Sequence, residues 1–199
     1  MNFLAHLFLS CEQEELLVGN FLADLIKNRA LETYSTGIQE GVLLHRKIDQ
    51  FTDQHPMVSQ GVHRLHPFHH KYAAVIVDVF YDYLLAKNWL LYTKEDFTVF
   101  TQRVYSILEK YKSVMPPKIQ IRLSNMIDGD WLIGYSQYEG LAFTFDRMQF
   151  RLSKPEYLHG VIENLQTHES AFDEEFRTFF PEVIAFVNDE CGCSSGYLN

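Results

Sequence analysis

The chain has 199 residues, a length that favours a single domain. Hydrophobic residues make up 47% of it and aromatic residues 15%, which is enough apolar surface for a sizeable core and argues against disorder. The formal net charge of −9 argues against nucleic acid as a general partner, because phosphate backbones require a basic surface. A local basic patch can still bind an acidic partner.

The three cysteines, Cys11, Cys191 and Cys193, do not form the paired pattern of a disulfide framework. The last two lie in a Gly/Ser-rich stretch, so we predict a flexible tail with free thiols over residues 191–199. Because nothing here requires an oxidising compartment, a cytoplasmic location is favoured.

The apolar N-terminus, MNFLAHLFLS, has no positively charged region, and acidic residues follow it at once. It is too short for a membrane span, which needs about 20 apolar residues. No other stretch is long enough. We therefore predict neither a signal peptide nor a membrane span.

Apolar periodicity predicts helices along the first part of the chain. Residues 1–9 are predicted as a short, nearly buried helix with one ionisable group, His6. A second helix follows through residue 27, and the third ends near His55 because Pro56 follows it. Capping boxes, each a Ser or Thr with a Gln three residues later, predict the starts of these two helices at Ser10–Gln13 and Thr36–Gln39.

Residues 57–71 contain four histidines with irregular spacing, and we predict a short, irregular and exposed segment there. A basic docking surface for an acidic partner and a set of additional metal ligands are the alternatives.

Further helices are predicted in the rest of the chain. They cover about residues 71–91, 93–112 with Thr93 as the cap, 118–127, 134–151, and a last helix from about residue 153 with a break at Pro181. We assign the aromatic positions 143–150 to the core. Because no run alternates with period two between turn residues, we predict no sheet. The chain is predicted to be a single all-α domain, a helical bundle, over residues 1–190.

The central helix carries the most informative polar pattern. His45, Asp49 and Asp53 are spaced i, i+4 and i+8, which places them along one side of the helix. A separate apolar face, which would seat the helix in a core, consists of Leu43, Leu44, Ile48 and Phe51. A solvated charged face, with Arg46 and Lys47 as partners, is the alternative interpretation of the same pattern.

Four apolar helical segments of the first 82 residues contain polar groups that must meet if the helices pack together, because an unpaired buried charge is costly. These groups are His6; Asn20 and Asp24; His45, Arg46, Asp49 and Asp53; and Asp78 and Asp82. Imidazoles with carboxylates form a mixed nitrogen and oxygen donor set that suits Mn²⁺, Fe²⁺, Zn²⁺ or Mg²⁺. A buried polar network without metal is the alternative. No GxSxG, P-loop or dinucleotide-binding motif is present.

Blocks of sequence that contain these polar groups resemble the acyl carrier protein phosphodiesterase family, in the family's order and at close to its spacing. The blocks are MNFLAH at residues 1–6, GNFLAD at 19–24, HRKID at 45–49 with Thr52 and Asp53, and Asp78 with Tyr81 and Asp82. The resemblance implies an all-helical, Mn²⁺-dependent hydrolase that removes 4′-phosphopantetheine from the serine of acyl carrier protein. It also implies a distant relationship to HD-domain phosphohydrolases, although the chain lacks their adjacent His-Asp pair.

We therefore expect His6, Asp24, His45, Asp49 and Asp78 to hold one divalent metal ion that activates a water molecule. Three residues are expected to act on the substrate: Arg46 to neutralise charge on the phosphodiester, and Asp53 or Asp82 to accept a proton or orient a ligand.

Further residues are expected to bind the substrate. Asn20 is expected to donate hydrogen bonds within the site. An acidic carrier protein is expected to dock on the turn with Lys27 and Arg29 and on the 63–71 segment with Arg64 and Lys71. The alternatives are a metal phosphohydrolase for a nucleotide or another small phosphodiester, and a non-catalytic helical binding module.

Overall fold

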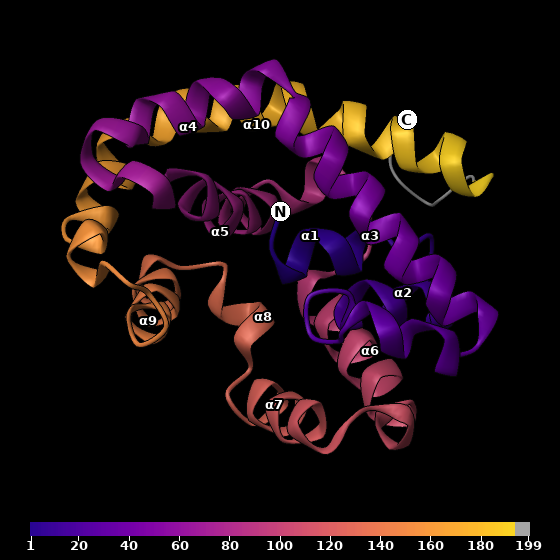
Figure 1. Ribbon diagram of the computed structural model, residues 1–199. Helices are drawn as coiled ribbons and strands as arrows, with labels where there is room; N and C mark the ends of the chain where they lie inside the picture. The colour runs from indigo at the N-terminus through magenta and orange to yellow at the C-terminus, as the bar shows by residue number, and fades with distance from the viewer. Residues whose placement is uncertain (194–199) are drawn as a thin grey trace.

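A computed structural model describes residues 1–193, and this part of the chain is built from ten α-helices with no strand (Figure 1). The α-helices are α1 (Phe3–Phe8), α2 (Glu14–Leu22), α3 (Thr36–Gln54), α4 (Pro56–His69), α5 (Ala73–Lys87), α6 (Phe97–Lys110), α7 (Pro117–Asp128), α8 (Trp131–Gly134), α9 (Tyr138–Gln149) and α10 (Val161–Cys191). Short 3-10 turns connect several of them, at Asn28–Thr33, His70–Tyr72, Trp89–Leu91, Lys112–Val114 and Pro155–Leu158. The all-α prediction is confirmed, whereas the likeness to HD-domain proteins stays a prediction.

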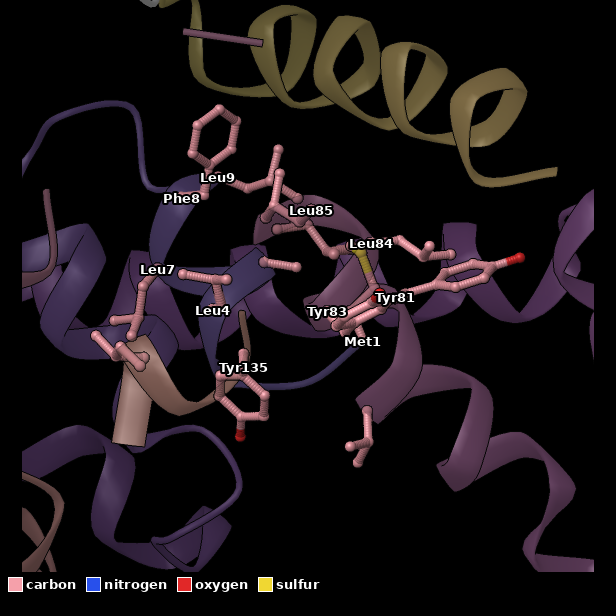
Figure 2. Close-up of a cluster of buried hydrophobic side chains, with 14 of the residues drawn as sticks. Met1, Leu4, Leu7, Phe8, Leu9, Tyr81, Tyr83, Leu84, Leu85 and Tyr135 are labelled. Carbon is pink, nitrogen blue, oxygen red and sulfur yellow. The ribbon is translucent and has the colours of Figure 1, made fainter. Parts of the chain in front are cut away.

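Helix α1 lies at the centre of the molecule, although a helix of six residues is marginal on its own (Figure 1). Its apolar side chains, Leu4 and Leu7 among them, are buried against the Tyr81–Leu85 part of α5 (Figure 2). The buried carboxylate of Asp82 accepts hydrogen bonds from the backbone N–H groups of Leu4 (2.8 Å) and Ala5 (3.1 Å). These N–H groups have no partner within the helix, so Asp82 caps α1 from a distant part of the chain.

The close approach of α2 and α3 depends on two glycines. A Cβ atom added to Gly19 would lie 2.2 Å from the carbonyl oxygen of Ile38, and one added to Gly41 would lie 2.4 Å from that of Leu16. Backbone atoms cannot move aside as a flexible side chain can. The two glycines therefore fix the distance between α2, which carries Asn20, and α3, which carries His45.

Residues 57–71 are not the predicted irregular segment, because most of them form α4. Pro56 occupies the first turn, where a missing N–H costs nothing, and His55 Nδ1 accepts a hydrogen bond from the Met57 backbone N–H. In Figure 1, α4 runs beside α10. Arg64 makes two hydrogen bonds to the Glu175 carboxylate, at 2.7 and 2.5 Å, and so links the two helices.

The three predicted helix caps are wrong, although α3 does begin at Thr36. α2 begins at Glu14 and α3 at Thr36, each without a side-chain cap, and the Ser10 hydroxyl donates instead to the His6 carbonyl oxygen. α6 is capped by Asp96 in place of Thr93.

The predicted break at Pro181 is also wrong, because α10 continues through it. Phe179, Phe180 and Val183 on either side of the proline are fully buried. Their packing offsets a cost of about 3 kcal/mol for proline inside a helix.

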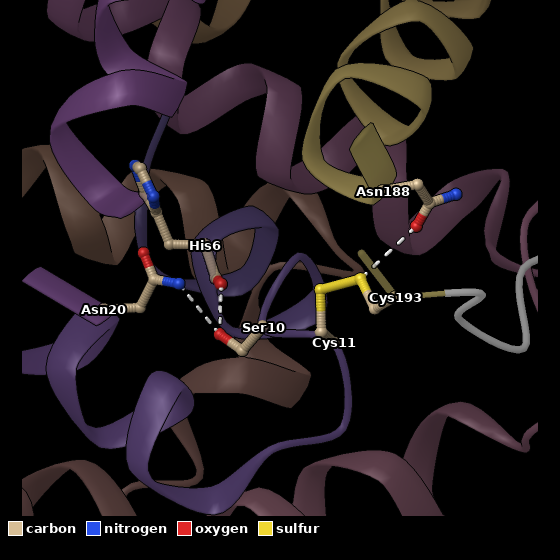
Figure 3. The surroundings of a disulfide bond; sticks show 6 residues. All are labelled: His6, Ser10, Cys11, Asn20, Asn188 and Cys193. Carbon is tan, nitrogen blue, oxygen red and sulfur yellow. Dashed lines mark hydrogen bonds between the residues drawn. A yellow bond between two sulfur atoms is a disulfide. The ribbon is translucent and has the colours of Figure 1, made fainter. Parts of the chain in front are cut away.

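The prediction of free thiols in the 191–199 tail is confirmed for Cys191 and wrong for Cys193. Cys11, in the turn after α1, forms a disulfide with Cys193, just beyond the end of α10, while Cys191 is a free thiol and the last residue of that helix (Figure 3). The disulfide ties the last helix to the turn that leads into α2. The rest of the expected flexible tail, residues 194–199, lies outside the described residues, and the cytoplasmic location stays a prediction.

Within residues 1–193, none of the helices combines the length and the apolar character that crossing a membrane would require.

The glycine contact leads to the first prediction. Gly41→Ala should lower the free energy of unfolding by about 1–3 kcal/mol, because the new Cβ would overlap backbone atoms of α2. An alanine at an unhindered helical glycine normally stabilises by up to about 1 kcal/mol. Gly134→Ala is the matched control, since its Cβ would have no neighbour closer than 3.9 Å. Urea unfolding measures both variants, and equal stability of the two would contradict the role of Gly41.

Candidate functional site

His45 on α3 is held in a defined orientation by the backbone of α2. Its Nδ1 lies 3.1 Å from the carbonyl oxygen of Asn20, which can only accept, so Nδ1 carries the hydrogen. Its Nε2 faces Asp49 Oδ2 at 3.1 Å and Asp24 Oδ1 at 3.4 Å. This nitrogen is buried and forms no well-aligned hydrogen bond with either carboxylate. A neutral His45 would thus turn a lone pair toward two carboxylates, an arrangement that calls for a cation.

His6 on α1 completes the same cluster. Its Nε2 lies 3.1 Å from Asp49 Oδ1, so the Asp49 carboxylate bridges His6 and His45 with one oxygen each. The two imidazole rings are stacked, with centroids 3.8 Å apart and an angle of 13° between their planes. Both histidines are buried, and Asp49 is partly exposed.

Burial and charge shift the pKa values of these groups in opposite directions. Burial lowers the pKa of His6 to about 4. Burial also lowers the pKa of His45, but the adjacent Asp24 and Asp49 carboxylates outweigh it and raise that pKa to about 9. Although burial raises the pKa of Asp49, the two imidazoles hold it well below its usual range. The cluster therefore favours one positive charge among its carboxylates.

A second positive charge lies close by. The buried amino group of Met1 is 3.1 Å from Asp78 Oδ1 and 3.6 Å from Asp49 Oδ1. Burial raises the pKa of Asp78, and the charges of Asp49 and Asp53 add to this effect. Carboxylates from α3 and α5 thus converge on one place.

The donor atoms of the cluster fit a divalent metal ion. His6, His45 and Asp49 each offer one ligand atom, and these atoms lie within 4.8 Å of one another. Asp24 adds a carboxylate oxygen on the exposed side. Two imidazole nitrogens with carboxylate oxygens suit Mn²⁺, Fe²⁺ or Zn²⁺. The hydrogen bond from His45 Nδ1 to a backbone carbonyl is the kind of support that metal-binding histidines commonly have.

Two residues expected to act on the substrate are buried away from it. Asp82 is fully buried and caps α1, and burial raises its pKa to about 7 even though the two N–H donors favour its charged form. Asn20 is also buried; its side chain donates to the Ser10 hydroxyl and its carbonyl oxygen orients His45 (Figure 3). Both are positioning residues, because neither side chain is open to a ligand.

Arg46 and Asp53 are both exposed, but they differ in their position relative to the cluster. The Arg46 guanidinium donates to the side chain of Asn28 (2.6 Å) and lines a groove with Lys47 and Glu190, so it is not aimed at the cluster as we expected. Asp53 lies one turn beyond Asp49 on the same side of α3, and its negative charge contributes to raising the pKa of Asp78.

The four predicted docking residues fall into two groups. Lys27 and Arg29 are exposed in the turn that follows Asp24, beside the cluster. Arg64 is engaged by Glu175, which neutralises its charge, and Lys71 donates to Ser153 at the other end of α4. The pairing with Glu175 therefore does not support the predicted role of Arg64 in docking the carrier protein.

The sequence reasoning missed residues from the second half of the chain that approach the cluster. The Tyr135 hydroxyl accepts a hydrogen bond from the Asn2 side chain (2.8 Å), next to Met1. Arg122 lies near enough to Asp24 for that carboxylate to affect its pKa. Phe143 and Phe150, which we assigned to the core, are 56% and 90% exposed. No spacing in the sequence connects these residues to the cluster, because separate helices bring them there.

Comparisons with known proteins identify relatives over nearly the whole chain. A family model described as acyl carrier protein phosphodiesterase matches residues 1–183. The chain is 30% identical to the acyl carrier protein phosphodiesterase of Photorhabdus laumondii, over 92% of this chain and 93% of the relative. It is 28% identical to the proteins of that name from Pectobacterium atrosepticum, over 96% and 99%, and from Escherichia coli O157:H7, over 93% and 96%. No solved structure matches the chain.

The charge on His45 leads to a prediction for the metal-free protein. Because its folded pKa is raised from 6.5 to about 9, protonated His45 stabilises the fold fully below pH 6.5, and this stabilisation is lost as the pH rises through 9. With chelator present, the free energy of unfolding of the wild type relative to His45→Gln should fall by up to about 3 kcal/mol over this range. A difference that stays constant with pH would contradict it.

Proposed function

The chain belongs to the acyl carrier protein phosphodiesterase family, and we propose that it hydrolyses the phosphodiester that joins 4′-phosphopantetheine to the serine of acyl carrier protein. The product is apo-acyl carrier protein. The observation that carries the proposal is the bridged His6–Asp49–His45 cluster, in which a buried imidazole nitrogen faces two carboxylates.

We propose further that this cluster holds a divalent metal ion, Mn²⁺ being the first candidate and Mg²⁺, Fe²⁺ or Zn²⁺ the alternatives. Such an ion supplies Lewis acidity toward a phosphoryl oxygen and lowers the pKa of water. The electrostatics support this assignment. Asp24, Asp49, Asp53 and Asp78 surround the site, and four carboxylates would repel an anionic phosphodiester unless a cation were bound between them.

Different residues of the chain would have different roles in such a site. Asp49 holds both imidazoles at a fixed separation, and the Asn20 carbonyl oxygen sets the tautomer of His45. Asp24 has 70% of its side chain exposed and forms the open side, where substrate would enter. Asp53, also exposed, is the residue proposed to accept a proton from the attacking water or to orient it.

Lys27 and Arg29 are the docking residues that remain for an acidic carrier protein. They are exposed in the turn directly after Asp24, so a bound partner would present its serine to the open side of the cluster. Charge complementarity of this kind increases the rate of association and weakens as the salt concentration rises.

The activity is tested by mass spectrometry of holo-acyl carrier protein incubated with the purified chain and Mn²⁺, with and without excess chelator. We expect conversion to the apo form that is lost with chelator. His45→Gln and Asp78→Asn should reduce kcat/KM at least about 100-fold, since the loss of one ligand of a metal site typically disables it. His66→Gln, an exposed histidine of α4, is the control and should retain full activity.

Metal binding is tested separately by thermal unfolding. Mn²⁺ should raise the Tm of the wild type and of His66→Gln, because a ligand that binds only the folded state stabilises it. It should leave the Tm of His45→Gln unchanged. Metal loading without conversion of the carrier protein would contradict the substrate and favour a small phosphodiester. A wild type that neither converts the carrier protein nor responds to metal would leave the cluster a structural polar network.

A further inference from the structure

A cavity of about 490 Å³ lies beside the metal cluster, between α7, α8 and α9. Figure 1 shows α8 between the other two helices, below α5. Its volume falls within the range of about 300–1,000 Å³ that is usual for small-molecule sites. None of the residues proposed to bind the metal ion or to dock the carrier protein lines this cavity.

Three arginines, Arg122, Arg147 and Arg151, line one part of the cavity. Among the described residues, no carboxylate lies within ion-pair distance of any of them, and the buried Nε of Arg122 has no hydrogen-bond partner. The cavity also contains Glu139, which leaves an excess of positive charge. In a chain of net charge −9, such a group of unpaired guanidinium ions indicates an anionic ligand.

The remaining wall is apolar. Val75 and Val79 contribute from α5, and Trp131, Phe143 and Met148 from α8 and α9. The Arg147 guanidinium lies over the Trp131 ring, 4.1 Å from its centroid, which fixes both side chains. The ligand therefore needs an apolar body in addition to its anionic group.

The position of the cavity relates it to the metal cluster. Asn2, which lines it, follows the Met1 amino group that pairs with Asp78, and Val79 follows Asp78 itself. Burial and the neighbouring Arg151 and Arg147 lower the pKa of Arg122, while Asp24 raises it. Arg122 therefore lines the cavity and also lies near enough to Asp24 to interact with its charge. Arg151 is exposed at the other side.

We propose that this cavity holds the 4′-phosphopantetheine arm, with Arg122 facing the phosphate and the pantetheine chain lying along the Val75, Val79 and Trp131 wall. The inference rests on the proposed function, because it assigns a binding pocket to the arm of that substrate. The chemistry matches at both ends: the phosphate meets guanidinium groups, and the geminal dimethyl group of the arm meets the valines and aromatic rings.

Trp131 supplies a direct readout of occupancy. The chain has two tryptophans, and Trp89 is buried elsewhere, so a Trp89→Phe background leaves Trp131 as the single emitter. Titration with 4′-phosphopantetheine should change its fluorescence with saturation. Pantetheine and inorganic phosphate, each carrying half of the recognition chemistry, should bind at least about 10-fold more weakly.

Amino-acid substitutions test whether 4′-phosphopantetheine binds in this cavity. Arg122→Met should weaken 4′-phosphopantetheine binding about 10- to 100-fold, the usual cost of losing a charge-assisted hydrogen bond. Thr144→Phe, which places a ring in the cavity, should weaken it similarly and lower kcat/KM for holo-acyl carrier protein, while the rise in Tm caused by Mn²⁺ stays unchanged. Arg177→Met, in a different cavity, is the control for loss of charge and should bind normally.

The outcomes separate this inference from the proposed function. Hydrolysis of holo-acyl carrier protein with no Trp131 response, and with Thr144→Phe fully active, would overturn the pocket assignment and leave the function intact. A saturable Trp131 response that Arg122→Met abolishes would support the pocket even if no hydrolysis were observed. Equal binding of inorganic phosphate and 4′-phosphopantetheine would also overturn it, because the apolar wall would then contribute nothing.

Discussion

The hydrogen bonds from Leu4 and Ala5 to the Asp82 carboxylate are the contacts on which the site depends. Without them α1 is a six-residue apolar segment with unsatisfied N–H groups in the middle of the core. With them its position against α5 is fixed, and His6 is held in stacking contact with His45. A buried acid that never meets the substrate thus determines where one of the two imidazoles lies.

The cluster itself is electrostatically incomplete. Four carboxylates and two imidazoles converge where a protonated His45 and the Met1 amino group offset part of the negative charge. Such an arrangement stores repulsion that a divalent cation would relieve, and the same cation would make the site attractive to a phosphodiester. In the proposed function, affinity for a metal ion and affinity for an anionic substrate would therefore both follow from one charge distribution.

The two halves of the chain contribute different properties to the proposed site. Helices α1, α3 and α5, with Asp24 just beyond the end of α2, carry the histidines and carboxylates, which suit metal chemistry. Helices α7, α8 and α9 carry the arginines and the apolar wall, which suit recognition of a long anionic arm. The Tyr135–Asn2 hydrogen bond joins the two sets next to Met1. Under the proposed function, this division would let an acidic protein bind an anionic arm, since three arginines are gathered in one cavity.

The sequence by itself determined the helical class and the convergence of His6, His45 and Asp49, because helix periodicity and the cost of burying unpaired charges are local rules. It could not distinguish candidate metal ligands from residues that only position them. Asp82 and Asn20 belong to the same helix faces as Asp78 and Asp24, and only the packing shows which of these side chains are buried away from a ligand. The pairing of Arg64 with Glu175, the Cys11–Cys193 disulfide and the arginine cavity were likewise decided by tertiary structure. Each joins residues far apart in the chain, and neither their spacing nor the cost of burying a charge identified them as partners.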